Sequence, residues 1–400
     1  MTATITVVGI GEDGWEGLSA DARAALTDAT SIVGSQRQLD LLPPLDATLE
    51  LLPSPLLDGL DALVATTSPL CVLASGDPMF HGIGTTLARR VPAERLRVIP
   101  AMSSVTLACA RLAWPATDVT VLSTLSVPLS VVGRALQPGR RILLLCRDGS
   151  TPAQLAALLT VHGWPDSPMH VLERLGGPKE RVVGPIPARD LAGSYDDLCV
   201  VAVVATPDAG SESLSTLPGL PESAYETDGQ ITRRELRVLA ISALMPMPGQ
   251  LLWDIGAGSG SIGVEWMRCD SSLRAIAIES RADRAERIAR NAEALGVPTL
   301  RVVAGEAPAV LADLPTPDAV FVGGGLTTPR LLETAWDRLA PGGRLVAHAV
   351  TVESEAVLHQ ARADHGGDLV KIDASHAEPL GSFTTWRPAL PIVQWQAVKR

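Results

Sequence analysis

The 400-residue chain contains no apolar run long enough to cross a membrane and no excess of basic residues. Its longest apolar runs, such as Ile142 to Cys146 and Leu198 to Ala205, are far shorter than the roughly 20 residues of a membrane-spanning helix. The formal net charge of −11 lacks the Lys and Arg excess that neutralises nucleic-acid phosphates. We therefore expect neither a membrane nor a nucleic acid as partner, although a local Arg cluster could hold an anionic small molecule.

The cysteines lack the spacing of a metal or redox motif, because they lie far apart and form no Cys-x-x-Cys pair. Most of them have apolar neighbours, which favours buried free thiols in a reducing compartment and argues against a zinc site. No basic segment or cleavage site precedes the stretch TITVVGIG, so we expect a cytoplasmic protein. The spacing of the cysteines leads us to expect no bound metal. The five cysteines are Cys71, Cys109, Cys146, Cys199 and Cys269.

The length and the order of patterns predict two α/β halves joined by a linker. The first half, residues 1–206, repeats one pattern in which a β-branched run leads through a Gly/Pro/Ser loop into an amphipathic helix. This alternation predicts parallel sheets covered on both faces, and turn residues near 113–119 divide the half into lobes of about 1–112 and 113–206. Residues 207–222 are rich in Ser, Pro and Gly and have no hydrophobic period, which is typical of a linker.

The second half, residues 223–400, predicts a doubly wound sheet. Its first helix is expected in TRRELRVLAISALM, and a second in RADRAERIARNAEALG. On the first helix the period places one set of side chains on one face: Leu236, Leu239, Ala240 and Ala243. Strands are expected in QLLWDIGAG, RAIAIES, LRVVAGEAP, DAVFVGGG and GGRLVAHAV, and the ligand should lie at their carboxyl ends.

The stretch LLWDIGAGSGSIGVEW, residues 251–266, predicts a strand, a glycine loop and a helix that together bind a nucleoside cofactor. Its glycines at 258, 260 and 263 match the fingerprint of dinucleotide-binding loops, yet S-adenosylmethionine (SAM) enzymes share this feature because both ligands carry an adenosine ribose. Loop residues expected to touch the cofactor are Gly256, Gly258 and Gly260.

Three acidic positions favour SAM over NAD. Asp254 lies two residues before the first glycine, where dinucleotide enzymes usually have an apolar residue and where a carboxylate can meet an ammonium group directly or through water. Glu279 ends the next predicted strand and can accept hydrogen bonds from ribose hydroxyls. Glu306, between Gly305 and Ala307 at the end of the following strand, can accept from the adenine amino group.

Loops of the first half also gather at predicted strand ends, as in a ligand cleft. The first contains Gly9 and Gly11, which alone indicate only a tight turn. The others supply backbone N–H groups and small side chains, although a serine before a helix is equally typical of a helix cap. The candidate residues in these other loops are Ser75, Gly76, Asp77, Ser103 and Ser104.

The motifs VVGIGEDG, ASGDPMFHGIG, PAMSSVTLACARL and ERLGGPKERVV resemble those of the tetrapyrrole (corrin/porphyrin) methylases. The second half, with GQITRRELR, WDIGAGSGSIGVEW, AIESRADRAERIARNAEALGV and GEAP, resembles their decarboxylating partners in cobalamin biosynthesis. The resemblance covers nearly the whole chain. One departure is the first loop, which reads Gly9-Ile10-Gly11-Glu12-Asp13 where many members of the family have Gly-x-Gly-Pro-Gly.

This resemblance implies a two-lobed tetrapyrrole methylase fold followed by a Rossmann-like methyltransferase domain, with SAM bound in each half. The implied substrate is a precorrin (6B or 6Y), which would be methylated at carbons 5 and 15 and would lose carbon dioxide from its ring C acetate to give precorrin-8. The family resemblance also makes a homo-oligomer plausible. No pyridoxal or metal is required, because the conjugated ring can accept the electrons that decarboxylation releases.

Candidates for catalysis and substrate binding are a histidine and several arginines. His348 follows a predicted strand and is either a proton donor or a structural histidine. Arg233, Arg234 and Arg237 open the first helix of the second half, and Arg387 lies in GSFTTWRP; each is either a carboxylate ligand or solvated surface. The segment Gly323 to Gly325 could approach a flat ligand closely or form a flexible turn.

Two other functions stay open. The first is a SAM methyltransferase that acts on RNA or protein, with a non-catalytic module in the first half. The acidic charge and the lack of an Asn-Pro-Pro-aromatic tetrad argue against it. The second is a scaffold in which one half only passes a tetrapyrrole on.

Overall fold

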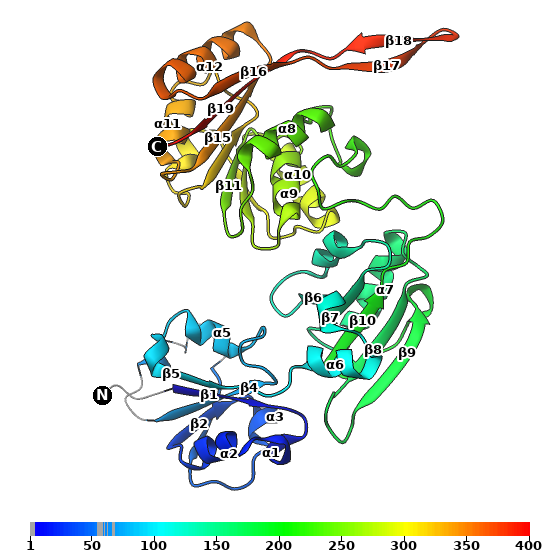
Figure 1. Ribbon diagram of the computed structural model, residues 1–400, viewed down its shortest axis with the longest axis vertical. Helices are drawn as coiled ribbons and strands as arrows, with labels where there is room; N and C mark the ends of the chain where they lie inside the picture. The colour runs from blue at the N-terminus through cyan, green and yellow to red at the C-terminus, as the bar shows by residue number, and fades with distance from the viewer. Residues whose placement is uncertain (1–4, 54–58, 60, 62, 66–68) are drawn as a thin grey trace. The chain divides into compact units, whose positions relative to one another are not determined.

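The computed structural model describes residues 5–53, 59, 61, 63–65 and 69–400, and its chain forms two compact units (Figure 1). The first unit consists of residues up to 126 together with 137–211, and the second of 127–136 together with 212–400. The segment 127–136 therefore belongs structurally to the second unit, although the chain reaches it early. Within the described ranges, no helix combines the length and the apolar character needed to span a membrane.

The first lobe of unit 1 is a five-stranded parallel sheet in the order β3-β2-β4-β1-β5, which confirms the predicted parallel arrangement here. Apolar side chains cover both of its faces, as expected of strands that are buried on two sides. The strands are β1 (Ile5–Ile10), β2 (Ser31–Gly34), β3 (Thr48–Leu51), β4 (Leu70–Ser75) and β5 (Leu96–Ile99). The helical elements are α1 (Gly14–Gly17), α2 (Ala20–Thr27), α3 (Gln36–Leu39), α5 (Ile83–Ala88) and η1 (Ala93–Arg95).

The second lobe contains a mixed sheet in the order β6-β7-β10-β8-β9, so the expected all-parallel sheet is wrong here. The strand–helix alternation continues only as far as β8. The strands β9 and β10 then follow without crossover α-helices. Strand β9 pairs antiparallel with β8, and β10 pairs antiparallel with both β7 and β8. The strands are β6 (Val119–Ser123), β7 (Arg141–Leu145), β8 (Pro168–Glu173), β9 (Arg181–Pro187) and β10 (Cys199–Val204). The helical elements are α6 (Ser104–Leu112), η2 (Ala116–Asp118), α7 (Thr151–Val161) and η4 (Ala188–Asp190).

Helix α6 packs on this second sheet. Val105, Ala108 and Cys109 of the helix lie in one apolar cluster with Leu143 of β7 and Val200 of β10. The packing therefore places α6 with the second lobe, whereas the expected division near 113–119 lies after this helix. Across the described residues all five cysteines are free thiols, and four of them are buried, as the sequence predicts.

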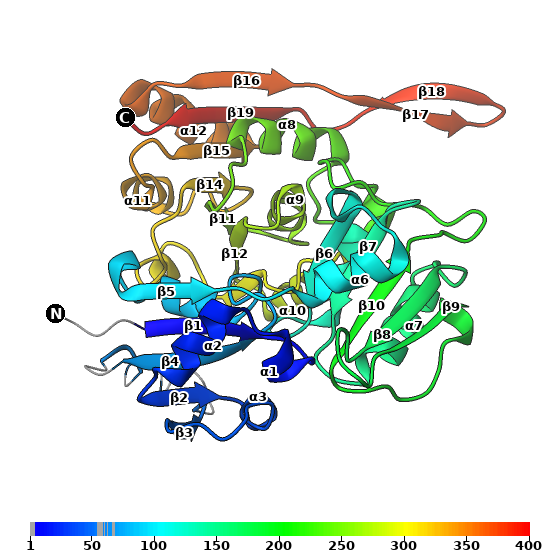
Figure 2. The same ribbon diagram turned by 60° about the horizontal axis from the view of Figure 1, so that its bottom comes forward.

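The second unit is built on a seven-stranded sheet in the order β13-β12-β11-β14-β15-β19-β16, and Figure 2 shows most of these strands in succession. The five strands that the sequence predicts are present and parallel, and β19 and β16 add an antiparallel edge. The strands are β11 (Leu251–Ile255), β12 (Arg274–Glu279), β13 (Arg301–Ala304), β14 (Ala319–Val322), β15 (Arg344–Ala349), β16 (Asp368–Ile372) and β19 (Ile392–Val398).

Helices cover both faces of this sheet, which makes it doubly wound. One apolar cluster contains side chains of α8, α9 and α10, and the cluster on the other face contains those of α11 and α12. The helical elements are α8 (Arg234–Leu244), α9 (Ser261–Cys269), α10 (Ala282–Ala294), α11 (Leu331–Arg338), α12 (Val352–His365), η5 (Glu222–Ala224) and η6 (Ala309–Leu311).

Helix α8 is rotated relative to the predicted face. Leu239 is 43% exposed, whereas Ile241 and the guanidinium of Arg237 are buried. Arg237 donates to Glu265 of α9 over 2.8 Å, and the Tyr225 hydroxyl donates to the same carboxylate over 3.0 Å. A buried ion pair thus replaces part of the expected apolar face, and Arg237 is not available to a substrate.

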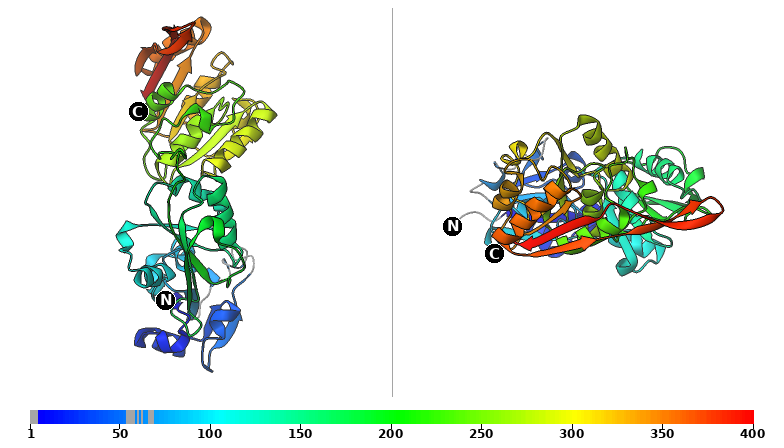
Figure 3. Two further views of the ribbon diagram at one scale, coloured as in Figure 1. Left: turned by 90° about the vertical axis from the view of Figure 1, so that its right-hand side faces the viewer. Right: turned by 90° about the horizontal axis from the view of Figure 1, so that it is seen from above.

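Two further segments complete the unit. The 3-10 helix η3 (Leu129–Ala135) lies against α10, where a side chain at Gly296 would come within 2.3 Å of the Arg134 nitrogen. The strands β17 (Ser375–Leu380) and β18 (Phe383–Pro388) form a hairpin that extends away from the seven-stranded sheet (Figures 1 and 3).

Candidate active site

The order of the seven-stranded sheet reverses between β11 and β14, and ligands of such sheets bind outside the carboxyl ends of the strands at that point. The loop after β11 and the loop after β14 meet there. Gly256 has φ +69°, and a Cβ added to it would lie 2.9 Å from the Gly324 nitrogen. The Gly323 N–H donates to the Ile255 carbonyl over 2.9 Å. Glycine is needed at 256 both for its backbone conformation and for this close approach.

Asp254 lies beneath the glycine loop and is 1% exposed. Its carboxylate accepts from the Gly263 N–H over 3.0 Å, at the start of α9. Burial raises the pKa of Asp254 to about 7, although the Gly263 hydrogen bond lowers it, and the nearby charge of Glu279 raises it further. A fully buried carboxyl with such a pKa is a site at which a cationic ligand group would favour the ionised form.

Glu279 ends β12 and faces the same loop. Its carboxylate accepts from the Gly258 N–H over 2.9 Å and from the Arg281 N–H over 3.1 Å. The side chain is thereby held at the carboxyl end of its strand. The next strand contributes Gly305, whose N–H donates to the Glu279 carbonyl over 2.9 Å. After it, Glu306 is exposed and Ala307 is buried. The three predicted acids therefore lie at or just beyond the carboxyl ends of the adjacent strands β11, β12 and β13.

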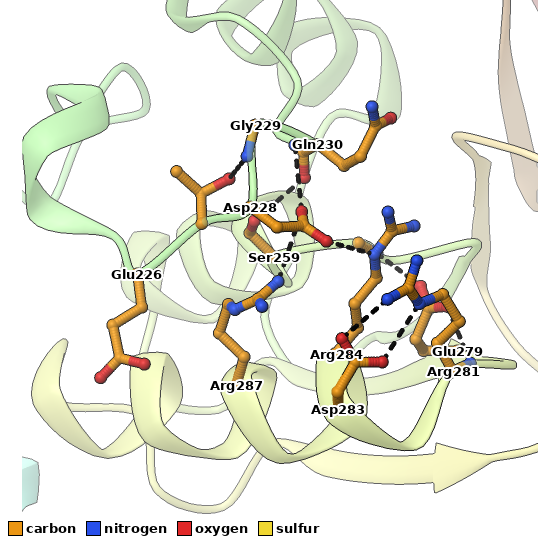
Figure 4. Close-up of polar contacts among 12 residues, drawn as sticks. Glu226, Asp228, Gly229, Gln230, Ser259, Glu279, Arg281, Asp283, Arg284 and Arg287 are labelled. Carbon is orange, nitrogen blue, oxygen red and sulfur yellow. Dashed lines mark hydrogen bonds and ion pairs between the residues drawn. The ribbon is translucent and has the colours of Figure 1, made fainter.

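Residues 226–230 cover the glycine loop, and we call them the strap; Gly229 and Gln230 open the motif GQITRRELR that carries the family resemblance, but the sequence predicted no cofactor role for them. The Ser259 hydroxyl of the loop donates to the Gln230 carbonyl over 3.0 Å. A Cβ added to Gly258, where φ is +61°, would lie 3.0 Å from that same carbonyl oxygen. Asp228 of the strap pairs with Arg284 and Arg287 of α10 (Figure 4).

The first unit contains a separate cavity of about 370 Å³ with mostly apolar walls. Four of the seven predicted residues line it, namely Gly11, Ser75, Gly76 and Ser104. The other three hold the loops in place. A Cβ added to Gly9 would lie 2.2 Å from the Gly76 carbonyl oxygen. Asp77 accepts from the Met79 N–H over 2.8 Å, and Ser103 caps α6 by accepting from the Thr106 N–H over 3.0 Å.

Charged residues at this cavity escaped the sequence analysis. Glu12, in the first loop, pairs with Arg37 after β2 and with Arg174 after β8, the latter over 3.0 Å. Arg37 also donates to the Ser75 hydroxyl over 2.6 Å. The only available signal was the acid at position 12, where the family resemblance leads one to expect proline. The partners of that acid lie far along the chain and carry no local motif.

The predicted catalytic residues lie in three different places. His348 of β15 is 7% exposed, pairs with Gln394 of β19 over 2.9 Å, and packs edge-on against Phe321. Burial lowers the pKa of His348, although the hydrogen bond to Gln394 opposes this, so the site suits a neutral structural imidazole. Arg233 pairs with Glu222 over 2.6 Å. Arg387 pairs with Glu378 over 3.0 Å on the extended hairpin, and both arginines are well exposed.

Comparison with known proteins gives the class first. Residues 4–191 match the family model of the tetrapyrrole (corrin/porphyrin) methylases, and residues 223–399 match that of the precorrin methyltransferase domain. The chain is thus a methyltransferase that joins two different methylase domains, consistent with the two lobes and the doubly wound sheet.

Relatives along the whole length then give the particular family. Proteins named precorrin-6Y C(5,15)-methyltransferase (decarboxylating) from Sinorhizobium sp and Mycobacterium tuberculosis are 47% and 45% identical; each match covers 99% of this chain, and 96% and 100% of those proteins. A Pyrobaculum calidifontis protein named probable cobalt-precorrin-6B C(15)-methyltransferase (decarboxylating) is 34% identical over 182 residues, which are 44% of this chain and 93% of that protein. The chain belongs to the family of decarboxylating precorrin-6Y C(5,15)-methyltransferases.

Proposed function

We propose that the protein uses SAM at two sites, one in each unit, to methylate carbons 5 and 15 of a precorrin and to decarboxylate its ring C acetate. The observation that carries the proposal is the presence of two unlike ligand sites in one chain. One is the apolar cavity of the first unit, and the other is the glycine loop with buried acids in the second. Two stereochemically different carbons of one large ring give a reason for two sites.

The second site fits SAM in its chemistry. The loop after β11 passes so close to the Gly324 backbone that no side chain could be accommodated at 256, and its backbone is therefore free of side chains on this side. The buried Asp254 provides a negative group for the ammonium of a methionine moiety, directly or through water, and Glu279 has the position for ribose hydroxyls. No pyrophosphate-binding role is needed for the loop. When bound, SAM supplies an electrophilic methyl group on a positively charged sulfur.

The protein's contribution to methyl transfer is positioning and exclusion of water. The attacking carbon of the reduced macrocycle is enamine-like and already nucleophilic, so no strong base is needed. Alignment of the two reactants can supply about 7 kcal/mol or more of the barrier. The mostly apolar walls of the first cavity suit a step in which positive charge on sulfur disappears.

We assign carbon 5 to the first unit, and carbon 15 together with the decarboxylation to the second. In the decarboxylation the bond to the acetate carboxyl carbon breaks, carbon dioxide leaves, and the electron pair enters the conjugated ring. A proton then completes the new methyl group. Support comes from the Pyrobaculum relative, whose name joins C(15) methylation to decarboxylation in a protein about half as long as this chain. Arg233 remains a proposed ligand of substrate carboxylates.

Gly256→Val tests this division of labour, because the added side chain would meet the backbone of Gly324. Incubation of the variant with SAM and the reduced precorrin, followed by mass analysis, should show one methyl group gained and no carbon dioxide lost. The wild type should gain two methyl groups and lose one carbon dioxide. Continued release of carbon dioxide by the variant would disprove the assignment, and calorimetry on the wild type would count the SAM sites directly.

The proposal also includes a cytoplasmic location and assembly into a homo-oligomer. Light scattering on the purified full chain measures its mass in solution. A mass equal to the 41.9 kDa of one chain would remove the oligomer from the proposal.

A further inference from the structure

The strap is fastened to helix α10 at two points. At its first residue, Asn291 accepts from the Glu226 N–H over 2.8 Å and donates to the Glu226 carbonyl over 3.0 Å. Two residues further on, Asp228 accepts from Arg284 over 2.9 Å, and its other oxygen lies 3.3 Å from Arg287 (Figure 4). The first fastening is buried, since Asn291 is 2% exposed, whereas the second is an ion pair at the surface.

The strap is in turn connected to the group that faces the proposed cofactor. Asp228 accepts from the Gln230 N–H over 3.2 Å, which shapes the turn that aims the Gln230 carbonyl at Ser259. Ser259 is 1% exposed, and its hydroxyl donates to that carbonyl. The preceding residue, Gly258, donates its N–H to the Glu279 carboxylate. A continuous series of contacts therefore runs from Arg284 through the strap and the glycine loop to Glu279.

We propose that Asp228, held by Arg284 and Arg287, is a positioning residue that sets the glycine loop and Glu279 for the cofactor of the second unit. The inference rests on the proposed function, because it assumes that SAM binds at this loop. Asp228 does not touch the cofactor position through its own carboxylate, which is occupied by α10 and by its own turn. It acts through the Gln230 carbonyl, which fixes Ser259 and limits the space above Gly258.

A role in positioning is separable from a role in overall stability. The side chains of Asp228, Arg284 and Arg287 are 26%, 20% and 16% exposed, so their ion pairs are partly screened by water. The two hydrogen bonds between Asn291 and the Glu226 backbone would hold the start of the strap to α10 even without these ion pairs. Loss of the ion pair should therefore free residues 228–230 locally, while the sheet and its helices stay folded.

The matched test compares Asp228→Asn with Asp283→Asn in the full chain. The asparagine at 228 keeps an oxygen that can accept from the Gln230 N–H, but it removes the charge and the second oxygen that accepts from Arg284. Asp283 forms an ion pair over 3.0 Å with Arg281 at the start of the same helix; both side chains are more than half exposed, and this pair does not include a residue of the strap. Calorimetric titration with SAM should show an affinity about tenfold weaker at one site in Asp228→Asn, and unchanged affinities in Asp283→Asn.

Further variants separate positioning from misfolding. Arg284→Gln should weaken the same site, Arg284→Lys should restore most of the affinity, and the double variant Asp228→Asn/Arg284→Gln should lose no more than either single variant. In an assay of methyl transfer by the second unit, the KM for SAM should rise while kcat changes little. The melting temperature should remain that of the wild type, which a general loss of structure would not allow.

The outcomes distinguish this inference from the proposed function. If the wild type binds SAM at the second unit and Asp228→Asn binds it equally well, the strap has no positioning role. If the wild type binds no SAM at that unit, the proposed function fails, and the inference fails with it. If only one site exists and Asp228→Asn weakens it, the positioning role is supported and the assignment of one site to each half is wrong.

Discussion

The two candidate ligand sites of this chain are built in different ways. In the first unit, loops from several strands converge on a mostly apolar cavity, and an acid in the first loop binds two arginines from distant parts of the fold. In the second unit, one strand–loop–helix segment supplies most of the site, and its acids lie at the ends of adjacent parallel strands. The first site depends on long-range side-chain pairing, and the second on local backbone geometry.

The two loops also require glycine for different physical reasons. Gly9 is required because the backbone of two other loops occupies the place of its side chain, whereas Gly258 is required chiefly for its left-handed conformation. The charged residues also differ. Asp254 is a buried carboxyl with no cationic partner among the described residues, whereas Glu12 has two. The following predictions test this comparison, from the largest effect to the smallest.

Asp254→Asn should change the pH dependence of stability most. The carboxyl titrates near 3.8 in the unfolded chain and near 7 in the folded protein. Between these values the folded protein holds a proton that the unfolded chain has released, so wild-type stability falls as pH rises from about 4 to about 7. Three pKa units correspond to roughly 4 kcal/mol.

The asparagine removes this titration but can still accept from the Gly263 N–H. The variant should therefore be more stable than the wild type by up to about 4 kcal/mol at pH 8, and by only about 1 kcal/mol near pH 4.5. Urea unfolding at the two pH values measures the difference. Its affinity for SAM should fall at the same time, and parallel stability curves for the two proteins would show that Asp254 ionises normally.

Gly9→Ala should destabilise the first unit by about 3 kcal/mol. The new methyl group would lie 2.2 Å from the Gly76 carbonyl oxygen and 2.5 Å from the Ala101 nitrogen, and both contacts are to backbone. Gly258→Ala should cost the second unit only about 1–2 kcal/mol, because its strain comes mainly from φ +61°. Calorimetric unfolding compares the two variants, and an equal or reversed order would contradict the contrast drawn between the loops.

Glu12→Gln should cost about 1–2 kcal/mol and weaken SAM binding at the first unit alone. The side chain is only 10% exposed and carries the charge shared by Arg37 and Arg174. Glu16→Gln is the control, since its carboxylate is 88% exposed and lies 4.0 Å from Arg23. A calorimetric titration in which both SAM affinities changed equally would argue against separate sites.

Arg233→Gln and Arg387→Ala should have the smallest effects on stability, within about 0.5 kcal/mol, because both ion pairs are exposed. If Arg233 binds a substrate carboxylate, the KM for the precorrin should rise in its variant without a change in the melting temperature. For Arg387, on the extended hairpin, we expect no change in KM within a single subunit. A raised KM there would show that the hairpin takes part in substrate binding.

The sequence predicts the strands of the second unit well because most of its parallel strands are apolar runs that end at an acid or lead into glycine. The same signals cannot show which strands pair. The insertion of β10 between β7 and β8, for example, depends on contacts across the whole lobe. The face of α8 was misassigned because Arg237 looks like a surface residue until Glu265 and Tyr225 are known to surround it.

The same limit applies to the sites. Backbone-determined positions such as Gly256 and Glu279 follow a local pattern, and the structure brings them together at the expected edge. In the sequence, the ion pairs of the strap cannot be recognised, because its partners Arg284 and Arg287 lie more than 50 residues further along the chain. Pairing at that distance leaves no period or motif that a single sequence reveals.

The position of η3 has a consequence for the order in which the protein folds during synthesis. Its residues leave the ribosome long before α10, the helix against which they pack, has been made. All residues of the first unit are therefore synthesised before the helix on which η3 packs. A fragment starting at residue 212 would likewise lack η3 and leave the surroundings of Gly296 uncovered, so the shortest complete version of the second unit is not a continuous piece of chain.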